Sequence, residues 1–93
     1  MNLHTTKVEH KIITSWVENG ASVLDLGCGD GKLLSILINE KHVRAHGIEI
    51  SDEAIHSCVA AGLNVFQEDI DTGLADYSDD SFDYVILNQT FQQ

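Results

Sequence analysis

The sequence predicts an α/β fold in which helices pack against a parallel sheet of four strands. Segments with the 3.6-residue period of a helix alternate along the chain with short aliphatic and β-branched runs that are typical of buried strands. Strands that alternate with helices of about ten residues form right-handed βαβ units, which makes neighbouring strands parallel. A length of 93 residues fits a single small domain over residues 1–93.

The first elements in chain order are a helix, a strand and a second helix. An apolar stripe predicts the first helix, and Gly20 occupies the position of its C-cap glycine. The residues of this stripe are Val8, Ile12, Ile13, Trp16 and Val17. Residues 22–26 then predict a buried strand. The run 31–41 is apolar around much of a helix, as expected for a helix that packs on a sheet face.

The remaining elements are three strands and one helix. Residues 43–50 predict the second strand, and Ser51 can cap a helix that ends at Gly62. The buried stripe of that helix is expected to consist of Ile55, Cys58 and Val59. Strands are also expected at 63–67 and 82–87, joined by an acidic loop.

The net charge of −10 arises entirely in the second half of the chain. Residues 1–44 carry five acids and five bases, whereas residues 45–93 carry ten acids and neither Lys nor Arg. Such a surface repels phosphate backbones, which disfavours nucleic-acid binding by bulk electrostatics. The acidic half indicates a cationic ligand or a basic partner surface, or it serves solubility alone.

Several other classes of protein lack support in the sequence. The apolar stretches are too short to span a membrane, and the first residues do not begin a signal peptide, so the cytoplasm is the expected compartment. Cys28 and Cys58 lie thirty residues apart and form neither a disulfide framework nor a zinc knuckle. The five histidines show no metal-ligand spacing, so no metal site is expected.

The segment Asp25-Leu26-Gly27-Cys28-Gly29-Asp30-Gly31 is a candidate ligand site. Ligands of open parallel sheets bind beyond the carboxyl ends of the strands, and glycines permit a tight turn and a close approach. The dinucleotide fingerprint Gly-x-Gly-x-x-Gly is not matched, because the third glycine is Gly31 and Lys32 follows it. Asp25 would attract an ammonium group, but it offers nothing to a pyrophosphate. The alternative is a purely structural turn.

Polar residues at the ends of the second and third strands extend this candidate site. Glu49 follows Gly31 by 18 residues, which is close to the spacing at which an acid accepts hydrogen bonds from ribose hydroxyls. An ordinary solvated acid is the alternative. Asp69 and Ile70 stand at the end of the third strand, where a carboxylate could accept from an exocyclic amine while an apolar side chain covers the base. This pair would suit adenine.

The run 23–31, Glu49 and Asp69 resemble motifs I, II and III of the class I S-adenosylmethionine (SAM)-dependent methyltransferases. Over residues 10–93 the chain is similar to the MetW family of methionine-biosynthesis proteins. The segments that carry this similarity are Gly47-Ile48-Glu49-Ile50, Gln67-Glu68-Asp69-Ile70-Asp71, Gly73-Leu74-Ala75-Asp76 and Asp80-Ser81-Phe82-Asp83-Tyr84-Val85-Ile86-Leu87-Asn88-Gln89-Thr90.

The resemblance implies that residues at the strand ends bind SAM. It assigns the methionine moiety to Gly27 and Gly29, with the ammonium group at Asp25. It assigns the ribose to Glu49 and the adenine to the acid–isoleucine pair after the third strand. The complete candidate set is Asp25, Gly27, Cys28, Gly29, Gly31, Glu49, Ile50, Asp69, Ile70 and Asn88.

The resemblance also implies the order of the strands. Numbered along the chain, the four predicted strands would lie in the order 3-2-1-4, as in the cofactor-binding half of a truncated, Rossmann-like methyltransferase fold. The strand at 82–87 would then be an open edge that carries Val85, Ile86 and Leu87. An open apolar edge is expected to associate with itself or to pair with a partner.

The function implied by the resemblance is that of a SAM-dependent, methyltransferase-like protein of methionine biosynthesis that acts with homoserine O-acyltransferase. Two alternatives remain open, namely a non-catalytic regulatory or binding subunit and an NAD-binding domain. Asn88, Gln89 and Thr90 stand where a methyl acceptor would lie, and they are poor bases at neutral pH. No catalytic residue is therefore assigned.

Overall fold

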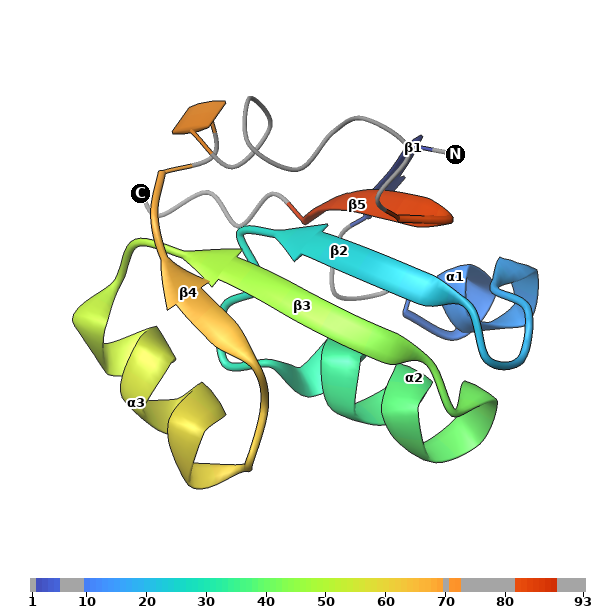
Figure 1. Ribbon diagram of the computed structural model, residues 1–93, viewed down its shortest axis with the longest axis horizontal. Coiled ribbons are helices and arrows are strands. Elements are labelled where there is room, and N and C mark those ends of the chain that lie inside the picture. Colours follow the sequence, from blue (N-terminus) through green and yellow to red (C-terminus); the bar gives the residue numbers. More distant parts are fainter. Residues whose placement is uncertain (1, 6–9, 70, 73–81, 89–93) are drawn as a thin grey trace.

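A computed structural model of the chain describes residues 2–5, 10–69, 71–72 and 82–88 (Figure 1). In chain order the elements are β1 (Asn2–Thr5), α1 (His10–Trp16), β2 (Ser22–Leu26), α2 (Lys32–Lys41), β3 (Arg44–Glu49), α3 (Asp52–Ala60), β4 (Val65–Gln67) and β5 (Tyr84–Asn88). Within these ranges, no helix has the length and apolar character that crossing a membrane requires.

The strands form one sheet in the order β1-β5-β2-β3-β4, and all of its pairings are parallel. The order β4-β3-β2-β5 is the predicted order 3-2-1-4, so the predicted Rossmann-like α/β arrangement is confirmed. In Figure 1, α2 and α3 lie on the same face of the sheet, and α1 contacts α2. β2 and β3 point to the left in this view, and because all pairings are parallel the carboxyl ends of the strands meet along one edge.

β2 lies in the centre of the sheet, and its apolar residues Val23, Leu24 and Leu26 are fully buried. A strand covered on both faces has a continuous apolar run, which is why its bounds could be predicted from the sequence. One buried cluster joins the helices to the sheet and consists of Ile13, Val17, Ala21, Val23, Leu33, Leu37, Val43, Tyr84 and Ile86. A second cluster consists of Leu24, Leu26, Ile48 and Val85.

The prediction of an open edge at the last strand is wrong. β1 pairs with β5 in parallel, with Leu3 opposite Ile86 and His4 opposite Leu87. Its four residues show neither an apolar run nor strict alternation, so their sequence does not predict a strand. Because β5 lies between β1 and β2, its backbone is paired on both sides and it does not offer the expected surface for self-association.

Removal of residues 1–5 should make the chain associate more strongly as its concentration rises. The deletion uncovers the backbone edge of β5, whose Val85 and Ile86 are buried in the intact fold. An unpaired apolar edge is a template for pairing with another chain. Light scattering of the intact and shortened chains over a concentration series measures the difference. Identical behaviour of the two chains would show that β1 does not protect this edge.

The stripe predicted for the first helix is only partly buried. Ile13 and Val17 lie in the core, whereas Ile12 and Trp16 are exposed. Residues four apart lie along one line of a helix, so the apolar residues form two neighbouring lines. Only the line that contains Ile13 faces the core. Val8 lies outside the described residues.

α3 begins and ends close to the predicted positions, and of its predicted buried stripe Cys58 is buried and Ile55 is partly buried. The Ser51 hydroxyl accepts the N–H of Ala54 at 3.3 Å, as an N-cap, and Gly62 lies after the last turn with φ of 78°. Cys58 is the buried residue of this helix. Val59, predicted to be buried, is 61% exposed because it points away from the sheet.

Candidate functional site

The turn between β2 and α2 is built from glycines in the left-handed conformation. Gly27, Gly29 and Gly31 have φ values of 75°, 59° and 82°, a region that favours glycine. The N–H groups of Gly27 and Cys28 donate to the carbonyl oxygen of Ile48 at 2.7 and 3.1 Å, which anchors the turn to β3. A Cβ atom added to Gly29 would meet nothing within 4 Å. The turn is therefore held by its backbone and faces space that a ligand can occupy.

Glu49, the last residue of β3, is hydrogen-bonded directly to this turn. Its Oε1 atom accepts the N–H of Gly29 at 2.8 Å. Its Oε2 atom accepts the N–H groups of Ile50 and Ser51 at 3.1 and 3.0 Å. The sequence predicted that the acid and the glycine turn meet at one edge of the sheet, and the structure joins them by this contact. Three backbone donors thus fix the carboxylate beside the open space.

Asp25 is a buried carboxylate within β2, two residues before the turn. It is 0% exposed and lies in register with Gly47 of β3 and Ile86 of β5. Its charge acts on the turn: burial is the main cause that raises the pKa of the Cys28 thiol, and the negative charge of Asp25 adds to the effect. A cationic group that approaches the turn would be attracted by the same charge.

Two further candidate residues, Ile50 and Asp69, lie on the outer side of the site; the pair predicted to contact adenine was Asp69 with Ile70, and Ile70 lies outside the described residues. Ile50 is 65% exposed at the start of the loop that leads to α3. Asp69 follows β4 and is exposed, and its Oδ1 atom accepts the N–H of Thr72 at 2.7 Å. This hydrogen bond is the main cause that lowers the pKa of the Asp69 carboxyl. Ile50 is thus available to cover a flat apolar ligand, whereas Asp69 caps a local turn.

The sheet register brings most of the candidate residues to one edge. Leu26 of β2 lies opposite Ile48 of β3 and Leu87 of β5, and Glu49 lies opposite Gln67 of β4. The candidates that meet at the ends of β2 and β3 are Asp25, Gly27, Cys28, Gly29, Gly31, Glu49 and Ile50. Asn88 is the last residue of β5, and only its backbone belongs to the described structure. Ile70 lies outside the described residues.

Three residues support the site without having been predicted from the sequence. The Asp30 carboxylate accepts the N–H of Lys32 at 3.0 Å, and an acid just before a helix is a signal that could have revealed it. The Gln67 side chain donates to the carbonyl oxygen of Ile50 at 3.1 Å and also to Asp52, which ties β4 to the loop after β3. Cys58 donates to the turn from α3, and no sequence signal indicates that contact.

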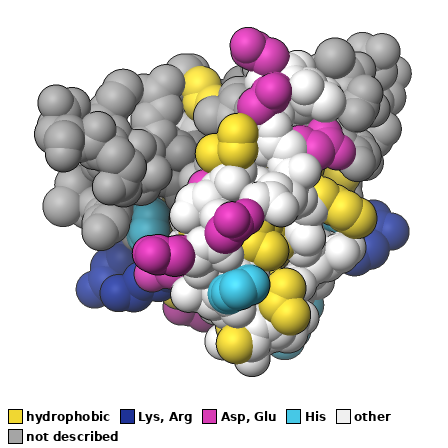
Figure 2. Space-filling model, turned by 90° about the vertical axis from the view of Figure 1, so that its left-hand side faces the viewer, with side chains coloured by type: hydrophobic (Ala, Val, Ile, Leu, Met, Phe, Trp, Pro, Cys, Tyr) yellow, Lys and Arg dark blue, Asp and Glu magenta, His cyan; other side chains and the backbone are white. Residues whose placement is uncertain are grey.

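The face at the carboxyl ends of the strands is acidic. Figure 2 views the molecule from this side and shows Asp and Glu side chains over the described surface, with the basic side chains that are visible lying toward the margins. The described acids after the ends of β2, β3 and β4 are Asp30, Asp52, Glu53, Glu68, Asp69 and Asp71, in addition to Glu49. Such a field favours a cationic ligand over an anionic one.

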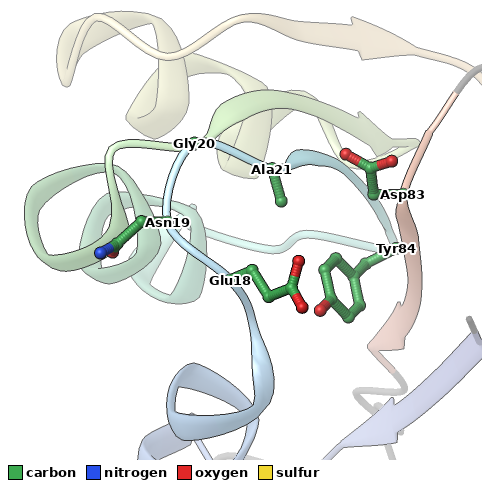
Figure 3. Close-up of a pocket in the computed structure, with 6 residues that line it drawn as sticks. All are labelled: Glu18, Asn19, Gly20, Ala21, Asp83 and Tyr84. Atoms are coloured by element: carbon green, nitrogen blue, oxygen red, sulfur yellow. The ribbon is translucent and has the colours of Figure 1, made fainter.

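A hollow lies at the amino ends of the strands, opposite the glycine turn. It has a volume of about 350 Å³ and is open to solvent (Figure 3). Its lining residues are Glu18, Asn19, Gly20, Ala21, Asp83 and Tyr84. Asp83 has a structural task here, because its carboxylate accepts the backbone N–H of Ser22 at 3.0 Å and joins β5 to β2. Ligands of parallel sheets bind at the other end of the strands.

The variant Asp83→Asn should remove an acid-sensitive part of the stability. The backbone N–H of Ser22 is the main cause that holds the pKa of Asp83 below its usual value, with help from the Ser22 hydroxyl and Arg44. The contribution of such a group is complete above the unfolded pKa and is lost as the pH falls through the folded pKa. Thermal melting from neutral to strongly acidic pH should therefore show a smaller acid-induced decline for the variant than for the parent.

Glu40→Gln is the matched control for that measurement, because Glu40 is an exposed acid of α2. Its melting temperature should follow the parent at each pH. Parallel pH profiles for Asp83→Asn and the parent would contradict the assigned role of the carboxylate.

Comparison with solved structures identifies the class of the fold. A SAM-dependent methyltransferase from Archaeoglobus fulgidus matches with a TM-score of 0.63 and 24% identity, over 82% of this chain and 37% of that one. A SAM-dependent methyltransferase from Thiobacillus denitrificans, solved in complex with S-adenosyl-L-homocysteine (SAH), matches with a TM-score of 0.60 and 25% identity, over 87% and 36% of the two chains. The chain has the Rossmann-like fold of SAM-dependent methyltransferases.

Within this class the chain belongs to the MetW family. Residues 7–93 match the family described as methionine biosynthesis protein MetW. The bifunctional methionine biosynthesis protein MetXA/MetW from Rhodopirellula baltica is 38% identical over an alignment of 97 positions that covers 95% of this chain. The resemblance predicted from the sequence is confirmed. Because the match spans only 15% of that protein, the activities and partners of the whole protein are proposals for this chain.

Proposed function

We propose that the chain is the SAM-binding part of a methyltransferase-like protein of methionine biosynthesis. The observation that carries this proposal is the contact between the Glu49 carboxylate and the N–H of Gly29, beside the open side of the glycine turn. It places an acceptor suited to ribose hydroxyls next to a backbone that a ligand can approach closely. The methyltransferase from Thiobacillus denitrificans, which holds SAH, supports the choice of ligand.

The chemistry of the residues fits SAM better than a dinucleotide. SAM carries a sulfonium and an ammonium group, whereas NAD carries a pyrophosphate. The buried Asp25 and the acidic face around the site attract the former and repel the latter. When bound, SAM supplies an electrophilic methyl group, and a protein that positions it against an acceptor can gain most of the rate without a base.

The proposed contacts follow from the positions of the residues. The glycine turn would flank the methionine moiety, with the ammonium group directed toward Asp25. Glu49 would accept hydrogen bonds from the ribose hydroxyls. Ile50, which is exposed beside Glu49, would cover the adenine, and Asp69 would lie at its outer edge.

Calorimetric titration of the chain with SAM, SAH and NAD tests the ligand. SAM and SAH are expected to bind, and NAD is expected not to bind under the same conditions. Binding of NAD in the absence of SAM binding would refute the proposal and favour the NAD-binding alternative.

The partner protein that this proposal includes is homoserine O-acyltransferase. In Rhodopirellula baltica the MetXA and MetW names belong to one bifunctional chain, which supports an association between the two activities. Pull-down of the acyltransferase by this chain, with and without SAM, tests the association. SAM-dependent capture would favour a regulatory or binding subunit, whereas failure to capture the acyltransferase in either condition would refute the partnership and leave the SAM site to be judged by calorimetry.

A further inference from the structure

The two cysteines of the chain meet behind the glycine turn. Cys28 lies in the turn and Cys58 in α3, yet their Sγ atoms are only 4.0 Å apart. They are 2% and 0% exposed, and both are free thiols. Their separation in the sequence does not indicate this pair, because the contact depends on how α3 lies against the glycine turn.

Two glycines provide the space that the sulfur atoms occupy. A Cβ atom on Gly47 would lie 2.8 Å from Sγ of Cys28, and a Cβ atom on Gly31 would lie 3.1 Å from Sγ of Cys58. Both distances are shorter than an ordinary van der Waals contact. The absence of side chains at these two positions is thus what lets the thiols approach each other.

The thiol pair is connected to the candidate cofactor site through one residue. The Cys58 thiol donates to the carbonyl oxygen of Gly29 at 3.2 Å. The N–H group of the same Gly29 donates to Oε1 of Glu49 at 2.8 Å. A displacement of the sulfur atoms therefore acts on a backbone segment that faces the proposed ligand.

The surroundings of the thiols define their order of reaction. Burial is the main cause that raises the pKa of both thiols. For Cys58 a hydrogen bond from Cys28 acts in the opposite direction, because it stabilises the Cys58 thiolate. The thiolate is the nucleophile in oxidation, so this hydrogen bond favours Cys58 over Cys28 as the first thiol to react. A thiol with a raised pKa is a poor leaving group, so a disulfide between the two would be reduced slowly.

Local opening of α3 would give an oxidant access to the pair. Cys58 is the one buried residue of this nine-residue helix, whereas Val59 and the acids of its first turn are exposed. Segments with few buried apolar contacts open at a lower free-energy cost than the global unfolding of the domain. Such an opening carries Cys58 out of the core, and reclosure returns it to Cys28.

We propose that Cys28 and Cys58 form a reversible disulfide under hydrogen peroxide and that this disulfide weakens cofactor binding, an effect that rests on the proposed function. In the first step the Cys58 sulfur attacks a peroxide oxygen, the O–O bond breaks, and the leaving hydroxide takes the thiol proton to form water and a sulfenic acid. In the second step the Cys28 sulfur attacks the sulfenic sulfur, the S–O bond breaks, and the hydroxide leaves with the Cys28 proton as a second water. The two thiols lose two electrons, and one peroxide is reduced to two waters.

The disulfide weakens the ligand site because it moves the turn. Its formation shortens the Sγ–Sγ separation from 4.0 Å to about 2 Å and removes the hydrogen bond from Cys58 to Gly29. The backbone on either side of Cys28 consists of glycines at positive φ, which can change conformation without a side-chain barrier. Since coupling between two sites is reciprocal at equilibrium, a bound cofactor must also oppose formation of the disulfide.

Peptide mapping and calorimetry of the same samples test the proposal. The chain is treated with hydrogen peroxide, alkylated, and cleaved by trypsin, which separates Cys28 in residues 12–32 from Cys58 in residues 45–93. A cross-linked pair of these peptides is expected within single chains. SAH affinity is expected to fall by roughly tenfold on oxidation, in the range of ordinary coupling between sites, and to recover after treatment with a small dithiol. Cys58→Ser, which keeps a donor near Gly29, should lose the response to peroxide.

Each outcome separates this proposal from the proposed function. Absence of the cross-linked peptides, or a disulfide that leaves SAH affinity unchanged, would overturn the proposal that oxidation regulates cofactor binding. In either case, SAH binding by the reduced chain would still support the proposed function. A reduced chain that binds no SAH would instead overturn the proposed function, and with it the proposal that the disulfide weakens cofactor binding. Protection of the thiols by saturating SAH is the further result expected from reciprocity.

Discussion

Glu49→Gln should weaken the binding of SAH by about 10- to 100-fold. A hydrogen bond to a charged group contributes about 1.5–3 kcal/mol, and about 1.4 kcal/mol corresponds to a factor of ten in affinity. The carboxylate accepts backbone N–H groups on both of its oxygens in this structure. A glutamine side chain has an NH₂ group in place of one oxygen. This donor would face at least one of the backbone N–H donors, and the ribose would have one acceptor atom fewer.

The ribose hydroxyls must compete with the backbone for this carboxylate. A carboxylate has about four acceptor positions, and N–H groups of Gly29, Ile50 and Ser51 already fill three of them. Two hydroxyl donors therefore require that one N–H is displaced or shared. Gly29 is the expected one, because it belongs to the turn that the ligand approaches. Its amide resonance should shift when SAH binds to the parent chain.

Glu53→Gln is the matched control for the binding experiment. It changes the net charge by the same amount, and Glu53 is exposed in the first turn of α3. Exposed surface charges contribute little, so the affinity for SAH should stay within about twofold of the parent. Equal affinities for the parent, Glu49→Gln and Glu53→Gln in calorimetry would exclude the ribose role of Glu49.

The parts of the fold that could be predicted from the sequence are those determined by local chemistry. β2 was predicted at its observed bounds, because a central parallel strand is buried on both faces and is therefore rich in apolar residues, here Val23, Leu24 and Leu26. The N-cap at Ser51 follows from the preference of hydroxyls for the first N–H groups of a helix. The meeting of Glu49 with the glycine turn follows from the rule that parallel strands end at the same edge.

The parts that could not be predicted depend on contacts between distant segments. β1 has a mixed sequence, and its pairing partner β5 lies at the other end of the chain. The direction of Val59 depends on which line of α3 the sheet covers, and an apolar side chain alone does not determine that line. The contact between Cys28 and Cys58 depends on the missing side chains of Gly31, in the same turn as Cys28, and of Gly47 in β3.

Gly31→Ala should destabilise the fold more than alanine at any other glycine tested alongside it. Gly31 has φ of 82°, where a residue with a Cβ atom is strained by about 1–2 kcal/mol. The added Cβ atom would also overlap with the side chain of Leu63 and lie 3.1 Å from Sγ of Cys58, and overpacking of this kind costs about 1–3 kcal/mol. A combined loss of roughly 2–5 kcal/mol is large beside the 5–15 kcal/mol of a typical domain.

Two other glycines separate the backbone cost from the packing cost. Gly62 has nearly the same φ, 78°, but a Cβ atom there meets nothing within 4 Å, so Gly62→Ala should show the strain alone. Gly47→Ala should show the packing cost without a positive φ, since its Cβ atom would crowd the side chains of Cys28, Leu34 and Val65. Urea unfolding of the three variants measures the free energies. If Gly31→Ala lowers the free energy of unfolding no more than Gly62→Ala does, the side chains of Leu63 and Cys58 can move aside at little cost. The glycine turn would then not fix the positions of the two thiols.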